Sequence, residues 1–109
     1  MILASDLDRT LIYSKRFLEG IGVACLNIEI YKDEPITYIT EEAQKLLKRV
    51  SQEMHLIPVT TRNLEQYKRI TLFDKLFKPE LYIVNNGGTI FYRDKEDLEW
   101  SRKIKYQLE

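Results

Sequence analysis

The sequence predicts an α/β fold in which helices connect the strands of a mostly parallel sheet. Three short apolar runs that end in polar residues predict strands over residues 2–5, 55–59 and 81–84. The first of them suits a strand that is buried on both faces. Strands that alternate with helices form parallel sheets with right-handed crossovers, so we expect all three strands to end at one edge, where such sheets bind ligands.

Local signals mark the two helices between these strands. Thr40 is a suitable N-cap for the first helix. Asn63 and Gln66 form a capping-box pair that opens a second helix over residues 64–70. The apolar face of the first helix is formed by residues at helical spacing, namely Ala43, Leu46, Leu47, Val50 and Met54.

A long excursion separates the first strand from the first helix. Residues 23–31 and 36–39 are β-prone, and turn-forming residues at 32–35 lie between them, which predicts a hairpin. The stretch from Thr10 to Thr40 is too long for an ordinary connection between a strand and a helix. We therefore expect a separate structural unit at this place.

Composition and charge exclude several classes of function. The chain has 109 residues, of which 44% are hydrophobic, and its 17 basic and 17 acidic side chains balance, as in one small globular domain. Without a basic field, neither nucleic acid nor an anionic membrane is an expected partner. The N-terminus has no signal-peptide pattern, and no apolar run approaches the roughly 20 residues that cross a bilayer. One cysteine, Cys25, indicates a reducing compartment, so we expect a cytoplasmic protein.

The residues that suggest chemistry directly follow the first strand, in Asp6-Leu7-Asp8-Arg9-Thr10-Leu11. Side chains two apart in extended backbone point the same way, so Asp6 and Asp8 are expected to face one site while Leu7 enters the core. Two close carboxylates repel each other unless a cation or a shared proton intervenes, which indicates a Mg²⁺ site. An aspartate can also attack phosphorus while a second acid protonates the leaving oxygen. A turn rich in Asp, without chemistry, is the alternative interpretation.

This segment resembles the nucleophile motif DxDxT of the haloacid dehalogenase (HAD) superfamily. Leu56-Ile57-Pro58-Val59-Thr60-Thr61-Arg62 is similar to the second motif of that superfamily, an apolar strand that ends in Thr and is often followed by Gly-Arg. Val84-Asn85-Asn86-Gly87-Gly88 is similar to the segment of Cof-type and sucrose-phosphatase-like members near which a cap domain is inserted. The resemblance spans residues 1 to about 92, and it departs from the family at Arg9 and Thr61, where Gly is frequent.

The resemblance implies a three-layer Rossmann-like parallel sheet, the HAD core, here incomplete and with a β-hairpin flap after the first strand. Residues 1–86 would form this core, with its first three strands and a flap at about 11–39. Residues 87–109 would be the start of a cap or a connecting segment. Within them, residues 89–92 suggest a strand, and a charged surface helix follows.

The function that the resemblance implies is a Mg²⁺-dependent phosphatase that acts through an aspartyl-phosphate on a small phosphorylated metabolite, such as a sugar phosphate. Asp6 would be the nucleophile and a metal ligand, and Asp8 the general acid/base, with its backbone carbonyl also facing the metal. Thr60 would bind phosphoryl oxygens and Asn86 would border the substrate cleft. The structural alternatives are a helix-capping hydroxyl for Thr60, a turn residue for Asn86 and a surface charge for Arg62.

The family pattern also requires a lysine on the phosphate and a late acidic pair, which come from later strands. Lys95, Lys103 and Lys105 lie in the charged terminal segment, and nothing marks a following strand, so neither group is assigned. We therefore expect a truncated enzyme with little turnover alone, whose exposed sheet edges favour self-association.

Two other classes of function remain open. A non-enzymatic HAD-like module that binds a partner would have the same fold without turnover. A receiver-like domain would accept phosphate on an aspartate at the end of the third strand, where Asn85 and Asn86 stand.

Overall fold

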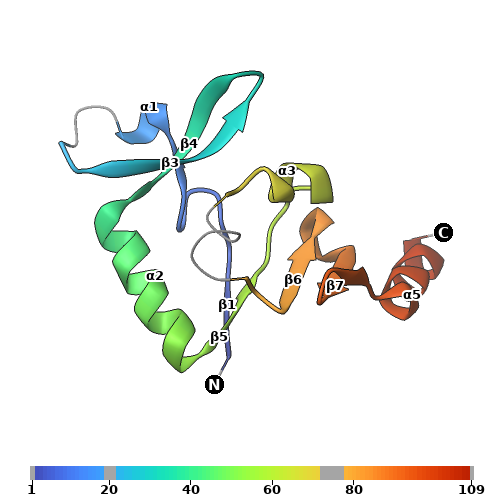
Figure 1. Ribbon diagram of the computed structural model, residues 1–109. Helices are drawn as coiled ribbons and strands as arrows, with labels where there is room; N and C mark the ends of the chain where they lie inside the picture. Colours follow the sequence, from blue (N-terminus) through green and yellow to red (C-terminus); the bar gives the residue numbers. More distant parts are fainter. Residues whose placement is uncertain (1, 19–21, 72–77, 109) are drawn as a thin grey trace.

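The computed structural model describes residues 2–18, 22–71 and 78–108, which form a mixed α/β structure (Figure 1). The strands are β1 (Ile2–Ser5), β2 (Tyr13–Ser14), β3 (Cys25–Tyr31), β4 (Glu34–Thr40), β5 (His55–Pro58), β6 (Leu81–Val84), β7 (Thr89–Tyr92) and β8 (Lys95–Glu96). The helices are α1 (Lys15–Leu18), α2 (Glu41–Glu53), α3 (Leu64–Lys68) and α5 (Leu98–Leu108), with a 3₁₀ turn, η1, at Asn85–Gly87.

The parallel part of the structure consists of β1, β5 and the end of β6. β1 and β5 pair in parallel, with Ile2 opposite His55 and Ser5 opposite Pro58. A parallel bridge between Val59 and Ile83 joins β5 to β6. The three predicted strands and the parallel β1–β5 pair are therefore confirmed, whereas the three-layer Rossmann-like arrangement stays a prediction.

One expectation for β1 is wrong. Ile2 and Leu3 are 65% and 39% exposed, although the apolar sequence of this strand suited burial on both faces. In the described part of the chain β1 pairs with β5 alone, so it is an edge strand there. Its apolar side chains consequently lack neighbours on one side, and hydrophobicity alone does not bury a strand.

The helix α2 begins where the sequence predicts. The side chain of Thr40 accepts a hydrogen bond from the N–H of Ala43 at 3.1 Å, which caps the helix. Leu47 is buried on the predicted apolar face, but Leu46 is 53% exposed, so this face is narrower than its sequence pattern. The second predicted helix forms as α3, and both hydrogen bonds of the Asn63–Gln66 capping box are present.

The excursion after β1 forms a three-stranded antiparallel sheet in the order β2-β4-β3, which we call the flap (Figure 1). The predicted β3–β4 hairpin is confirmed, although its turn is shorter than residues 32–35. Lys32 and Asp33 occupy this turn with φ values of 51° and 64°. Two successive left-handed residues are the signature of a type I′ turn, whose twist matches that of the flanking strands.

A bulge in β3 decides which of its side chains is buried. The pairing with β4 shifts on both sides of Glu29, so that Ile28 and Glu29 are both buried, at 4% and 1% exposure. The side-chain amide of Asn27 donates to the backbone oxygens of Glu29 and Thr37, at 2.9 and 3.0 Å, and holds the bulge. Glu29 therefore points into the interior together with Ile28. In a regular strand, only one of two consecutive side chains would face inward.

The core runs between the flap, α2, α3 and β5–β7. Its aromatic part is a stack in which the ring centroid of Tyr82 lies 4.5 Å from that of Tyr67 and 5.2 Å from that of Phe91. The buried apolar residues are Leu7, Ile12, Ile28, Ile39, Leu47, Leu56, Tyr67, Ile70, Tyr82, Val84 and Phe91.

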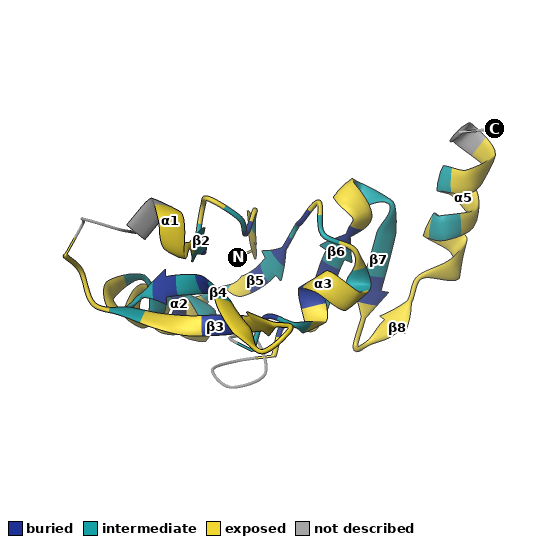
Figure 2. Ribbon diagram, turned by 90° about the horizontal axis from the view of Figure 1, so that it is seen from above, coloured by how far each residue is buried: buried dark blue, intermediate teal, exposed yellow. Residues whose placement is uncertain are grey.

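The predicted terminal helix forms as α5 and follows the antiparallel β6-β7-β8 sheet. Figure 2 shows it at one end of the molecule, with most of its surface exposed. Trp100 fastens it to the turn after β6, because its indole N–H donates to the backbone oxygen of Gly87 at 2.9 Å. None of the helices in the described ranges combines the length and apolar character that a membrane span requires.

The flap turn provides a first test. We expect Asp33→Gly to raise the free energy of unfolding by about 0.5 kcal/mol, because Gly adopts a left-handed φ without steric cost. Asp33→Ala should lower it, since Ala tolerates this conformation less well than Asp. Urea denaturation of both variants measures the difference, and a more stable Ala variant would contradict the turn geometry.

Candidate active site

The loops after β1, β5 and β6 meet at the carboxyl edge of these strands and line one hollow of about 460 Å³. Asp6 comes from the first loop, Thr60 and Thr61 from the second, and Asn86 from the third. The second and third loops are fastened together by two backbone hydrogen bonds. The N–H of Asn86 donates to the oxygen of Thr60 at 3.0 Å, and that of Asn85 to the oxygen of Arg62 at 2.7 Å. Asp6, Thr60 and Asn86 are thus brought together, as expected from the parallel strands.

Thr60 is almost fully buried, at 2% exposure. Its hydroxyl oxygen accepts a hydrogen bond from the N–H of Arg62 at 3.1 Å, and its own N–H donates to Ile83 at 2.9 Å. The side chain therefore shapes the loop after β5, as a capping hydroxyl does. Thr60 also belongs to the residues that line the hollow of Asp6.

The turn after β6 requires the residue types found there. Asn85, Asn86 and Gly87 have φ values of 53°, 54° and 91°, in the left-handed region that Asn and Gly enter most readily. The side-chain amide of Asn85 donates to the hydroxyl of Thr89 at 3.0 Å and closes the turn. Asn86 is therefore a turn residue, and the turn places it beside the hollow that Asp6 lines.

The acidic loop after β1 alternates as the sequence predicts. Leu7 is fully buried, and its oxygen accepts hydrogen bonds from the N–H groups of Thr10, Leu11 and Ile12 at 2.9–3.1 Å. Asp6 is exposed and accepts a long hydrogen bond of 3.4 Å from the hydroxyl of Thr10. Arg9 has a φ of 65°, which accounts for the frequency of Gly at this position in the family it resembles.

Asp8 lines a second hollow of about 470 Å³ beneath the flap, which shares Thr61 with the first. Its two carboxylate oxygens accept hydrogen bonds from Nε and Nη2 of Arg62, both at 2.8 Å. The structure does not place Asp6 and Asp8 in one hollow, as their spacing had led us to expect: they line neighbouring hollows, and Arg62 holds the Asp8 side chain in the second of them.

Arg62 is not the surface charge of the alternative interpretation, because its side chain is only 13% exposed. Its other edge, Nη1 and Nη2, donates to both carboxylate oxygens of Glu29 at 2.9 Å. Nη1 also donates to the backbone oxygen of Gln66 at 3.0 Å. Burial disfavours the charged guanidinium, yet the carboxylates of Asp8 and Glu29 outweigh it and raise the pKa of Arg62 above its ordinary value.

Glu29 completes this cluster from the flap. Besides Arg62, its oxygens accept hydrogen bonds from the hydroxyl of Thr37 at 2.6 Å and from Nε of Arg69 at 3.0 Å. Burial favours the neutral acid, but the hydrogen bonds from Arg62 and Thr37 outweigh it and lower the pKa of Glu29 below its ordinary value of 4.5. Sequence reasoning missed Glu29, and the one signal for it was an acidic residue within an otherwise β-prone run.

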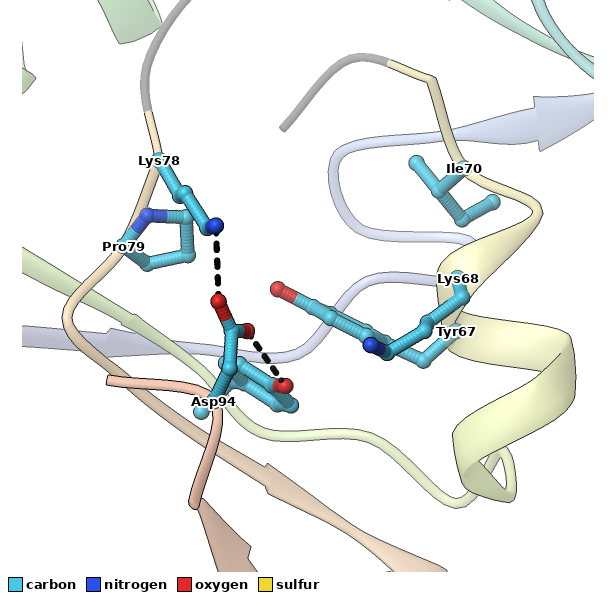
Figure 3. Close-up of a pocket in the computed structure, with 7 residues that line it drawn as sticks. Tyr67, Lys68, Ile70, Lys78, Pro79 and Asp94 are labelled. Atoms are coloured by element: carbon cyan, nitrogen blue, oxygen red, sulfur yellow. Dashed lines mark hydrogen bonds and ion pairs between the residues drawn. The ribbon is translucent and has the colours of Figure 1, made fainter. Parts of the chain in front are cut away.

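A third, smaller cavity of about 190 Å³ lies at the other end of β6 (Figure 3). Here Asp94 accepts a hydrogen bond from the hydroxyl of Tyr82 at 2.9 Å and pairs with Lys78 at 2.7 Å. The hydrogen bonds from Lys78 and Tyr82 lower the pKa of Asp94, and burial followed by the contact with Asp94 raises that of Tyr82. Asp94 therefore lines this third cavity and is not among the residues that line the hollow of Asp6.

The groups near Asp6 offer Mg²⁺ few protein ligands. In the part of the chain that is described, no group of three or more His, Cys, Asp or Glu side chains could hold a metal ion. Mg²⁺ commonly takes only one or two protein carboxylates and keeps several waters. The exposed carboxylate of Asp6 fits such a mode, whereas the Asp8 side chain is bound by Arg62.

An acidic loop after β1, with the loops of Thr60 and Asn86 beside it, is the arrangement expected of a HAD-type protein. Residues 1–109 match the model of the sucrose-6F-phosphate phosphohydrolase family. The chain therefore belongs to this family, which is part of the HAD superfamily. No curated protein matches it.

The Arg62 cluster generates a stability prediction. Arg62→Gln should lower the free energy of unfolding by about 3–5 kcal/mol, because it leaves the buried Glu29 carboxylate without its main partner. Arg93→Gln is the control, since it removes a surface pair with Glu80 whose side chains are 68% and 57% exposed. That variant should lose less than about 1 kcal/mol, and equal losses in urea denaturation would contradict the assigned burial.

The pKa of Glu29 generates a second prediction. Because this pKa is lower in the folded chain than its ordinary value of 4.5, ionised Glu29 stabilises the fold above about pH 4.5. The stabilisation is lost as the pH falls further, through the folded-state pKa. Urea midpoints of wild type should therefore drop more steeply between about pH 5 and pH 3 than those of Glu29→Gln. Parallel pH profiles would show that Glu29 is not ionised in the fold.

Proposed function

We propose that this chain carries the nucleophile and part of the substrate site of a Mg²⁺-dependent phosphatase that acts on a sugar phosphate through an aspartyl-phosphate. The observation that carries the proposal is the open carboxylate of Asp6 at the strand edge where Thr60 and Asn86 meet. Membership of the sucrose-6F-phosphate phosphohydrolase family supports the substrate class.

Asp6 is proposed to attack phosphorus with one carboxylate oxygen, so that an acyl-phosphate forms and the bond to the sugar oxygen breaks. Asp8 acts as general acid in this step: it must first take up a proton, which it then gives to the departing sugar oxygen. In the second step Asp8, now ionised, takes a proton from water, and the resulting hydroxide attacks phosphorus and frees Asp6.

The remaining groups are proposed to hold the phosphoryl group. Mg²⁺, bound by the Asp6 carboxylate and the Asp8 backbone carbonyl, would neutralise phosphate charge that would otherwise repel Asp6. Thr60 would donate to a phosphoryl oxygen, and Asn86 would border the cleft on the side of β6. Residues 87–109 would begin the cap or a connection to it.

Turnover by this chain alone is expected to be slow. No lysine occurs among the described residues that line the hollow of Asp6, and a positive charge on the phosphate is a large part of phosphoryl-transfer catalysis. The exposed edge of β1 would also favour self-association. The same lack of a lysine among the described residues of this hollow favours, as a second candidate, a HAD-like module that binds a ligand without turnover.

Phosphate release from sugar phosphates and from an aryl phosphate, with and without Mg²⁺, tests the proposal. We expect Mg²⁺-dependent release that Asp6→Asn abolishes, because an amide does not attack phosphorus. Asp33→Asn is the matched control, since it removes an exposed acid of the flap turn and should leave the rate unchanged.

Slow turnover calls for a second measurement of the same site. Beryllofluoride mimics the phosphoryl group of an acyl-phosphate, so ¹⁹F NMR should show Mg²⁺-dependent binding in wild type and in Asp33→Asn. Asp6→Asn should show none. Hydrolysis or binding that persists in Asp6→Asn would disprove the assigned nucleophile, and neither signal in wild type would leave the binding module as the function.

A further inference from the structure

Glu29 is the one fully buried carboxylate among the described residues, and the proposed chemistry does not use it. It lies on the flap strand β3, far along the chain from the acidic loop, and the bulge beside it turns it inward. Burying a carboxylate is unfavourable unless strong partners compensate for the lost hydration. Glu29 has four hydrogen bonds, three of them from the arginines 62 and 69.

The geometry of Arg62 links Glu29 to Asp8. A guanidinium is planar and rigid, and Arg62 binds one carboxylate along each of two edges. The Nε–Nη2 edge donates to Asp8 at 2.8 Å, and the Nη1–Nη2 edge donates to Glu29 at 2.9 Å. The shared Nη2 means that a rotation of Arg62 away from Glu29 also displaces its contacts with Asp8.

We propose that Glu29 is a positioning residue that fixes the Asp8 carboxylate through Arg62, so that Asp8 is in place only while the flap is seated. The inference rests on the proposed function, in which Asp8 is the general acid/base. It adds that a residue of the flap, outside the three sequence motifs, controls the geometry of that group.

Contacts from two further residues, Arg69 and Thr71, hold the flap at the same point. Thr71 donates to the backbone oxygen of Ile28 through both its N–H, at 2.8 Å, and its hydroxyl, at 3.1 Å. Arg69 donates to Glu29, and its guanidinium lies 4.5 Å from the ring centroid of Tyr31. Arg69 and Thr71 therefore contact β3 on both sides of Glu29. Any movement of β3 away from them would also withdraw Glu29 from Arg62.

NMR on the folded chain tests the link without any catalytic turnover. The Nε–H of Arg62 should exchange slowly with water in wild type, and Glu29→Gln should speed this exchange about tenfold or more. The ¹³C resonance of the Asp8 carboxyl should move in the same variant. Thr37→Val is the matched control: it removes one neutral hydrogen bond from Glu29, keeps both arginine contacts and should leave both signals nearly unchanged.

Steady-state kinetics distinguishes a positioning role of Glu29 from a merely structural one. A sugar leaving group needs the proton of Asp8, whereas an aryl phosphate has a good leaving group that does not. Glu29→Gln should therefore lower kcat for the sugar phosphate by about 100-fold, with little change in KM, and affect the aryl phosphate much less. Equal losses on both substrates would overturn the proposal.

The outcomes separate this inference from the proposed function. Absence of phosphate release and of beryllofluoride binding in wild type overturns the function, and with it the role given to Asp8. Unchanged Arg62 and Asp8 signals in a folded Glu29→Gln variant overturn the positioning role alone. If that variant does not fold, wild type decides, because an Arg62 Nε–H that exchanges as fast as that of free arginine also overturns the proposal.

Discussion

Arg62 holds together four segments that are distant in the sequence, three of them through its guanidinium. The five N–H groups of its guanidinium donate to Asp8 after β1, to Glu29 on β3 and to the backbone oxygen of Gln66 in α3. The backbone oxygen of Arg62 accepts a hydrogen bond from the N–H of Asn85, in the turn after β6. An arginine buried to this degree must have all its donors satisfied, and two carboxylates close by would repel each other without it. Without Arg62, both the flap and the acidic loop would lose the hydrogen bonds that join them.

The same arrangement explains why the candidate site consists of two neighbouring hollows. Asp6 remains open at the strand edge, beside Thr60 and Asn86, whereas Asp8 is held beneath the flap. In the proposed reaction these two carboxylates have different tasks, attack on phosphorus and proton transfer, and different surroundings are how a protein separates two similar acids. The flap thereby becomes part of the site.

Much of the local structure could be predicted, because it depends on interactions between residues close in sequence. The Thr40 cap, the Asn63–Gln66 capping box, the β3–β4 hairpin and the inward direction of Leu7 all formed as expected. The exposure of Ile2 was not predicted, since burial of a strand depends on what lies beside it. Glu29 was missed because the bulge that buries it arises from its register with β4, which no periodicity in β3 reveals.

By itself the sequence determined the α/β class, the order of the main strands and helices and the convergence of Asp6, Thr60 and Asn86, because parallel strands end at a common edge whatever surrounds them. Only the tertiary structure decided the state of Arg62, which its sequence neighbours left as either a motif residue or a surface charge. Its partners Asp8 and Glu29 come from separate parts of the chain, and their attraction acts only once folding has brought them within hydrogen-bond distance in a region shielded from water.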